Sequence, residues 1–205
     1  MGILKKKTES LYTKPSDYSC FQAFAKGNII TKLSLVIFGL GNFLNKQFVR
    51  GIVFLGLEIA YIVYMVSFGI TSLQNFITLG TKEQGQVYNE ALGIYEYSKG
   101  DNSMLCLLYG VITIVLTLAA VFVAFISCKS AFCTQFRKEK GMKIPYFKDD
   151  LRSVREENLH SVLLAFPLLG IIVFTIVPLI FMILIAFTSY DRNHQPPGNL
   201  FEWVG

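Results

Sequence analysis

Apolar residues in this chain form long uninterrupted blocks that are separated by polar and charged segments. A helix needs about 20 apolar residues to cross a hydrocarbon core about 30 Å thick. Three blocks meet this length, within residues 49–71, 104–128 and 159–189. The pattern therefore predicts an all-α membrane protein with three transmembrane helices.

A fourth apolar stretch, residues 29–45, is shorter and more interrupted. It holds Lys32 in its first turn and Gly39 and Gly41 near its end. Because it falls below the usual spanning length, we expect one short interfacial or re-entrant helix over residues 29–48. If it crossed the membrane, basic residues would occupy a very short external loop, which the distribution of positive charge in membrane proteins disfavours.

Lysine and arginine are unevenly distributed among the connections, and this predicts the orientation. Residues 1–28 hold five of them and residues 128–160 hold eight, whereas residues 71–103 hold two and residues 189–205 hold one. Since basic loops stay in the cytoplasm, we expect a multi-pass protein of the cell (plasma) membrane with a cytoplasmic N-terminus. The predicted order is a cytoplasmic N-terminal segment (1–28), the short element (29–48), the first span (49–71), an external loop (72–103), the second span (104–128), a basic cytoplasmic loop (129–158), the third span (159–189) and an external tail (190–205).

Composition narrows the possible functions. The chain is 53% hydrophobic and only 16% charged, against about 25% charged in soluble domains, so an ordinary soluble enzyme is excluded. The net charge is +5, and the basic residues flank the apolar blocks. The expected partner is therefore membrane lipid and not nucleic acid. The four cysteines form no C-x-x-C pair, and phosphate-loop and hydrolase motifs are absent. We therefore predict no catalytic residue, no cofactor, no metal site and no enzymatic activity.

Three residues inside the spans are candidates for function. Glu58 is the one acidic residue within a span, and an unpaired carboxylate in lipid is costly. It is a candidate intramembrane polar contact, either docking the short element or taking part in the passage of a solute or proton. Pro167 and Pro178 lie in the third span; each removes a backbone donor, so each is a candidate for a kink or a gate.

Two stretches carry a resemblance to a known family. The first is LLAFPLLGIIVFTIVPLIFMILIAF, followed by TSYDR and PPGNLFEWVG, within residues 163–205, and the second is KLSLVIFGLGNFLNKQFVRGIVFLGLEI, residues 32–59. They resemble the N-terminal part of permease subunits of carbohydrate ABC importers of the maltose/maltodextrin type. The residues of the family-like motif after the third span are Tyr190, Asp191, Phe201, Trp203, Val204 and Gly205.

This resemblance implies the N-terminal portion of a permease subunit in an ATP-driven sugar or oligosaccharide importer. The expected partners are a second permease subunit, ATPase subunits and an external sugar-binding protein. The Glu-Ala-Ala…Gly loop through which the family couples to its ATPase does not occur in this sequence, so only the N-terminal part of the family is represented. The alternative is a small multi-span membrane structural or assembly protein without transport activity of its own.

Overall fold

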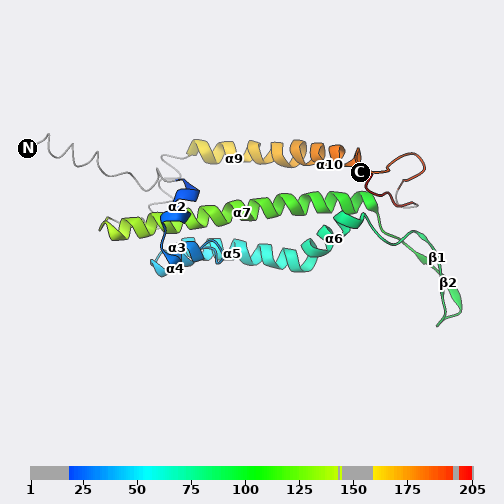
Figure 1. Cartoon of the computed structure of the whole chain (residues 1–205), viewed down its shortest axis with the longest axis horizontal. Coiled ribbons are helices and arrows are strands. Elements are labelled where there is room, and N and C mark those ends of the chain that lie inside the picture. The colour runs from blue at the N-terminus through cyan, green and yellow to red at the C-terminus, as the bar shows by residue number, and fades with distance from the viewer. Residues whose placement is uncertain (1–18, 143, 145–158, 196–198, 205) are drawn as a thin grey trace, which may run out of the picture. The chain divides into compact units, whose positions relative to one another are not determined.

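The computed structural model describes residues 19–142, 144, 159–195 and 199–204 (Figure 1). The chain divides into two compact units. The first unit comprises residues 1–62 and 119–158, and the second unit comprises residues 63–118 and 159–205. Both units are built mainly from helices.

Within the described residues, three helices are long and apolar enough to cross a membrane, which confirms the predicted fold class. They cover Phe48–Thr78, Ser103–Glu139 and Leu163–Ile185. The first consists of α5, the π-helical turn η2 and α6; the second is α7; the third consists of α9, the π-helical turn η3 and α10. The bounds are α5 Phe48–Tyr64, η2 Met65–Gly69, α6 Ile70–Thr78, α7 Ser103–Glu139, α9 Leu159–Ile171, η3 Ile172–Ile176 and α10 Val177–Ile185.

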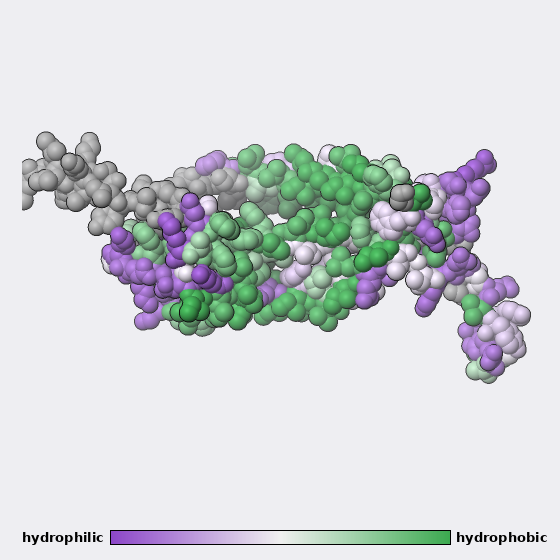
Figure 2. Space-filling model, viewed as in Figure 1, coloured by the Kyte–Doolittle hydropathy of each residue, from purple (hydrophilic) through white to green (hydrophobic). Residues whose placement is uncertain are grey.

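The surface of these helices is apolar. Large side chains such as Phe166 and Phe174 are about four-fifths exposed, at 76% and 81%. Figure 2 shows the apolar surface along the helices and hydrophilic residues at the hairpin. Exposing so much contiguous apolar surface to water is unfavourable, whereas a bilayer solvates it without cost. The chain is therefore a multi-pass membrane protein.

The short element predicted over residues 29–48 is divided in two. After α2 (Cys20–Lys26), the chain forms α3 (Ile29–Leu33) and α4 (Leu40–Leu44), joined by a turn. The turn ends at Gly39, whose φ of +79° lies in the left-handed region. Residues with a side chain rarely adopt this conformation, so a continuous right-handed helix is interrupted there.

The second unit contains a β-hairpin that the hydrophobic pattern did not predict. Strand β1 (Gly85–Asn89) pairs antiparallel with β2 (Ile94–Ser98), and Tyr88 lies opposite Tyr95. The base of the hairpin is closed by Asp101, whose carboxylate accepts the backbone N–H groups of Thr81 and Lys82 at 2.9 and 3.0 Å. These two bonds lower the pKa of the Asp101 carboxyl group.

A small apolar core lies where α6 ends and α7 begins. Leu79, Leu107 and Phe201 are almost completely buried in it. Partly buried side chains from α10 pack against the same core, among them Phe181 and Leu184. This core brings together the ends of three helices within the second unit.

Candidate functional sites

Residues 28–47, which we call the docked segment, pack on one face of α7 in the first unit. The contacting residues of α7 recur with the spacing of a helix face, because residues three, four and seven apart lie on the same side. They are Ser127, Ser130, Ala131, Thr134, Gln135 and Lys138.

Hydrogen bonds between polar groups connect the two surfaces. Gln135 accepts hydrogen bonds from the Asn28 backbone and the Thr31 hydroxyl. The preceding residue of α7, Thr134, donates to the side-chain oxygen of Gln47 at 2.9 Å. Because Thr31, Gln47 and Thr134 are buried and burying a polar group without a partner is costly, these bonds favour one position of the segment.

The turn before α4 makes the closest approach. The Gly39 N–H donates to the Ser127 hydroxyl at 2.7 Å, and the Gly41 N–H donates to the Ser34 hydroxyl at the same distance. A Cβ atom on Gly41 would lie 2.5 Å from the Cβ of Ala131. Small residues therefore allow the turn to rest directly on α7, as in other tightly packed membrane helices.

Glu58 lies on the same turn from the side of α5. Its Oε2 atom accepts the Phe38 backbone N–H at 2.9 Å. A hydrogen bond from a backbone N–H group to a carboxylate partly offsets the free-energy cost of removing that carboxylate from water. The arrangement suits a docking group, one of the two roles considered for Glu58; its role in solute or proton passage stays untested.

Pro167 and Pro178 flank a local change in helix type. Pro167 lies inside α9, and Pro178 lies at the beginning of α10. The π-helical turn η3 between them ends with a bond from the Val177 N–H to the Ile172 carbonyl. Because proline donates no backbone bond, the helix is locally weakened at both positions, and π-helical turns are frequent at functional sites.

The family-like motif closes the end of the second unit at which α10 ends. After α10 the chain turns back, so that Thr188 pairs antiparallel with Trp203. Ser189 donates its N–H to the Glu202 carbonyl, and Val204 donates to the Phe187 carbonyl, both at 2.8 Å. We call the paired residues 187–190 and 201–204 the cap.

Phe201 and Trp203 anchor the cap to the helix ends. Phe201 is 1% exposed, its N–H reaches the Ser103 hydroxyl, and its ring meets Tyr190 edge to face at 5.7 Å between centroids. The Trp203 indole donates to the Phe76 carbonyl at 3.2 Å. The sequence placed these residues in one motif but gave no sign that Phe76 is their partner.

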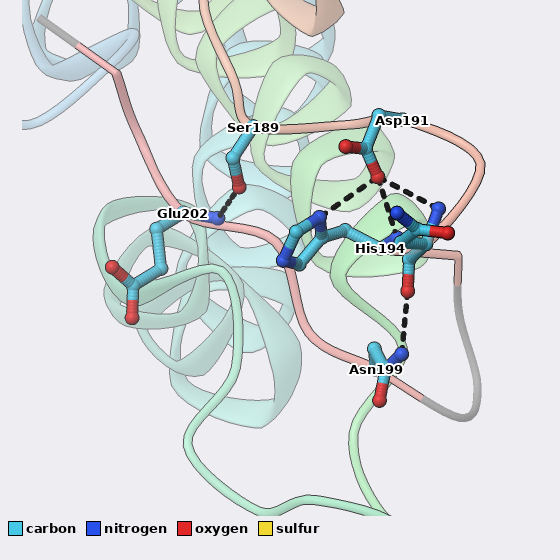
Figure 3. Close-up of polar contacts among 6 residues, drawn as sticks. Ser189, Asp191, His194, Asn199 and Glu202 are labelled. Atoms are coloured by element: carbon cyan, nitrogen blue, oxygen red, sulfur yellow. Dashed lines mark hydrogen bonds and ion pairs between the residues drawn. The ribbon is translucent and has the colours of Figure 1, made fainter.

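Asp191 organises the loop that follows α10. Its Oδ1 atom accepts three hydrogen bonds, each at 2.8 Å (Figure 3). The donors are the ring Nδ1 of His194 and the backbone N–H groups of Asn193 and His194. The bond with the His194 side chain, followed by the two backbone bonds, lowers the pKa of the Asp191 carboxyl group. Gly205 lies outside the described residues.

No group of three or more histidine, cysteine or acidic side chains is placed to hold a metal ion within the described ranges. The features present in the described residues are close helix packing, a change of helix type in the third span and the closure of the loop after α10.

Comparison with known proteins identifies relatives of one kind. The chain is 33% identical over 171 residues to the maltodextrin transport system permease protein MalC of Streptococcus pneumoniae. It is 28% identical over 177 residues to the galactooligosaccharides transport system permease protein GanP of Bacillus subtilis, and 26% identical over 171 residues to MdxF, a maltodextrin transport system permease protein of the same organism.

The matches cover 83% to 86% of this chain but only 36% to 38% of each relative. The chain thus spans a little over a third of the length of these curated relatives, which fits an N-terminal portion. No family model and no solved structure matches the chain. The resemblance inferred from the sequence motifs is confirmed.

Proposed function

We propose that this chain, a homologue of part of the permease proteins of oligosaccharide transport systems, forms the N-terminal membrane portion of such a permease. The supporting observation is that 83% of the chain aligns with a maltodextrin permease, and the aligned length includes membrane-spanning helices. The substrate class is an oligosaccharide. Transport is driven by ATP hydrolysis on separate ATPase subunits, together with a second permease subunit and an external sugar-binding protein.

In this function, each feature of the fold has a mechanical role. The docked segment fixes α5 and α7 of the first unit to each other through Glu58 and Ser127. The cap holds the outer end of the second unit. The third span, weakened by Pro167 and Pro178, bends during alternating access. No residue of this chain carries out covalent chemistry.

Uptake of labelled oligosaccharide tests the proposed function. We expect that disrupting the gene abolishes uptake of radiolabelled maltodextrin or galactooligosaccharide, and that restoring the intact gene returns it. Normal uptake of both sugars in the disrupted strain would instead support the structural or assembly role.

The proposed orientation can be tested with reporters placed at two positions. Asn89 ends β1 in the hairpin, and Lys140 follows the last residue of α7. Because the connection around Lys140 is rich in basic residues and the hairpin loop is not, a reporter at Asn89 is expected to respond as external and one at Lys140 as cytoplasmic. The measurement is alkaline phosphatase against fluorescent-protein activity, and a reversed pair of signals would contradict the orientation.

A further inference from the structure

An apolar pocket of about 180 Å³ lies in the first unit between the turn before α4 and the first turns of α5. Ile37, Phe38, Leu40 and Phe43 form one wall, and Ile52 and Leu55 form the other. The pocket adjoins the place where two glycines meet. A Cβ on Gly39 would lie 2.7 Å from the carbonyl oxygen of Gly51, so glycine at position 39 allows the two backbones to approach closely at the edge of the pocket.

The pocket walls are open to the surroundings. Ile52 is 60% exposed, and the side chains of Ile37, Phe43 and Leu55 are also exposed. Apolar cavities of this kind do not hold ordered water, because water finds no polar partner there. In a membrane protein, a lipid acyl chain is an apolar group that can fill such a pocket.

Two basic residues lie close in sequence to pocket residues, just before and within the first turn of α5. Lys46 donates its backbone N–H to the carbonyl of the pocket residue Phe43 at 3.1 Å, and its side chain is exposed. Arg50 precedes the pocket residue Gly51. The N-terminus of a long helix adds a further favourable field for an anion.

Basic residues dominate the first unit as a whole. Its described residues contain eight basic and two acidic side chains. The basic residues are Lys26, Lys32, Lys46, Arg50, Lys129, Arg137, Lys138 and Lys140, and the acidic residues are Glu58 and Glu139. Basic pockets between membrane helices are complementary to anionic lipid head groups.

We propose that this pocket binds one acyl chain of an anionic phospholipid whose phosphate lies against Lys46 and the beginning of α5. The lipid fills the hollow between the docked segment and α5 and covers apolar side chains on both. Its acyl chain supplies the apolar contacts and its head group supplies the preference for negative charge. The site depends on membrane insertion alone and is independent of the proposed transport function.

Photocross-linking tests the acyl-chain part of the proposal. The full chain is reconstituted in nanodiscs containing phosphatidylglycerol with a diazirine in its acyl chain, and labelled peptides are identified by mass spectrometry. We expect labelling to concentrate at residues 37–43 and 51–55. Labelling spread evenly along α5 would overturn the proposal.

A variant that fills the pocket provides the matched comparison. Leu55→Trp places a larger side chain in the pocket, whereas Leu57→Trp changes an exposed leucine of the same helix that does not line it. Displacing two methylene groups reduces occupancy about fifteenfold, since each buried methylene contributes roughly a factor of four. Labelling at residues 37–43 should fall by this amount in Leu55→Trp and stay unchanged in Leu57→Trp; equal labelling in both variants contradicts the site.

A second pair of variants tests the head-group part without altering the pocket. Lys46→Gln should reduce the preference for phosphatidylglycerol over phosphatidylcholine about fivefold, the contribution of one basic residue near an anionic surface. Lys32→Gln is the control, because the Lys32 ammonium group lies over the Phe24 ring, away from the pocket. If the unaltered protein labels equally with both lipids, the assigned lipid class is wrong.

Discussion

Replacing Gly39 with alanine is expected to release the docked segment from α5 and α7. The φ of +79° costs a residue with a side chain roughly 1–2 kcal/mol. The new Cβ would also lie 2.7 Å and 2.9 Å from backbone atoms of Gly51, and overpacking of this kind costs about 1–3 kcal/mol. Together these effects destabilise docking by about 2–5 kcal/mol.

Hydrogen exchange measures this release directly. The N–H groups of Phe38, Gly39 and Gly41 are held by side chains of Glu58, Ser127 and Ser34. Amide exchange in residues 37–43 should therefore become at least about 30-fold faster in Gly39→Ala than in the unaltered protein, as the lower end of the destabilisation requires.

The chain offers a matched glycine as a control. Gly56 lies on α5, and a Cβ added there would meet nothing within 4 Å. Gly56→Ala should leave exchange in the docked segment unchanged, because alanine is the better helix former and makes no clash. Unaltered exchange in Gly39→Ala would show that the close approach of Gly39 and Gly51 does not hold the segment.

Glu58→Gln separates the hydrogen bond from the charge at the same site. Glutamine keeps an oxygen that can accept the Phe38 N–H, so docking should weaken by less than about 1 kcal/mol, in the range measured for hydrogen bonds between membrane helices. Full release of the segment would show that the negative charge itself is required.

Replacing Phe201 with alanine is expected to have the second large effect. Phe201 is 1% exposed and packs with Leu79 and Leu107. Removing a buried phenylalanine ring costs about 3–5 kcal/mol, because a cavity replaces its contacts. The loss should open the cap and detach Trp203 from Phe76.

Fluorescence reports on the cap because Trp203 is the one tryptophan in the chain. Its indole is 36% exposed and bonded to the Phe76 carbonyl. In Phe201→Ala the emission maximum should move to longer wavelength, quenching by iodide should increase, and the denaturation midpoint followed by this signal should fall.

Phe187→Ala provides the control for this prediction. Phe187 belongs to the same cap, but its side chain is 58% exposed, and its part in the cap is the backbone carbonyl that Val204 contacts. Alanine keeps that carbonyl, so little change in Trp203 emission is expected. Equal shifts in the two variants would mean that the buried ring does not anchor the cap.

Two features were predictable from the sequence: the presence of three membrane-length apolar helices among the described residues, and the kind of transport protein to which the chain is related. Length and apolar content decide whether a segment crosses a bilayer, and both are local properties of residues such as those around Leu107 and Phe174. The same reasoning isolated Glu58, since a single carboxylate in an apolar block is costly wherever it lies. The motif that includes Tyr190 and Asp191 and ends in Trp203, Val204 and Gly205 was specific enough to indicate a resemblance to sugar permeases.

Tertiary structure alone decided what these residues contact. Ser127 and Thr134 are ordinary members of an apolar helix until the docked segment gives them partners 88 and 87 positions away, respectively. The Glu58 carboxylate meets the Phe38 amide because Gly39 takes a left-handed conformation next to Gly51. Such pairings depend on the close approach of backbone segments that are distant in sequence, and hydrophobic periodicity contains no information about that approach. The length of each helix and its preference for lipid over water, by contrast, are properties of its own residues.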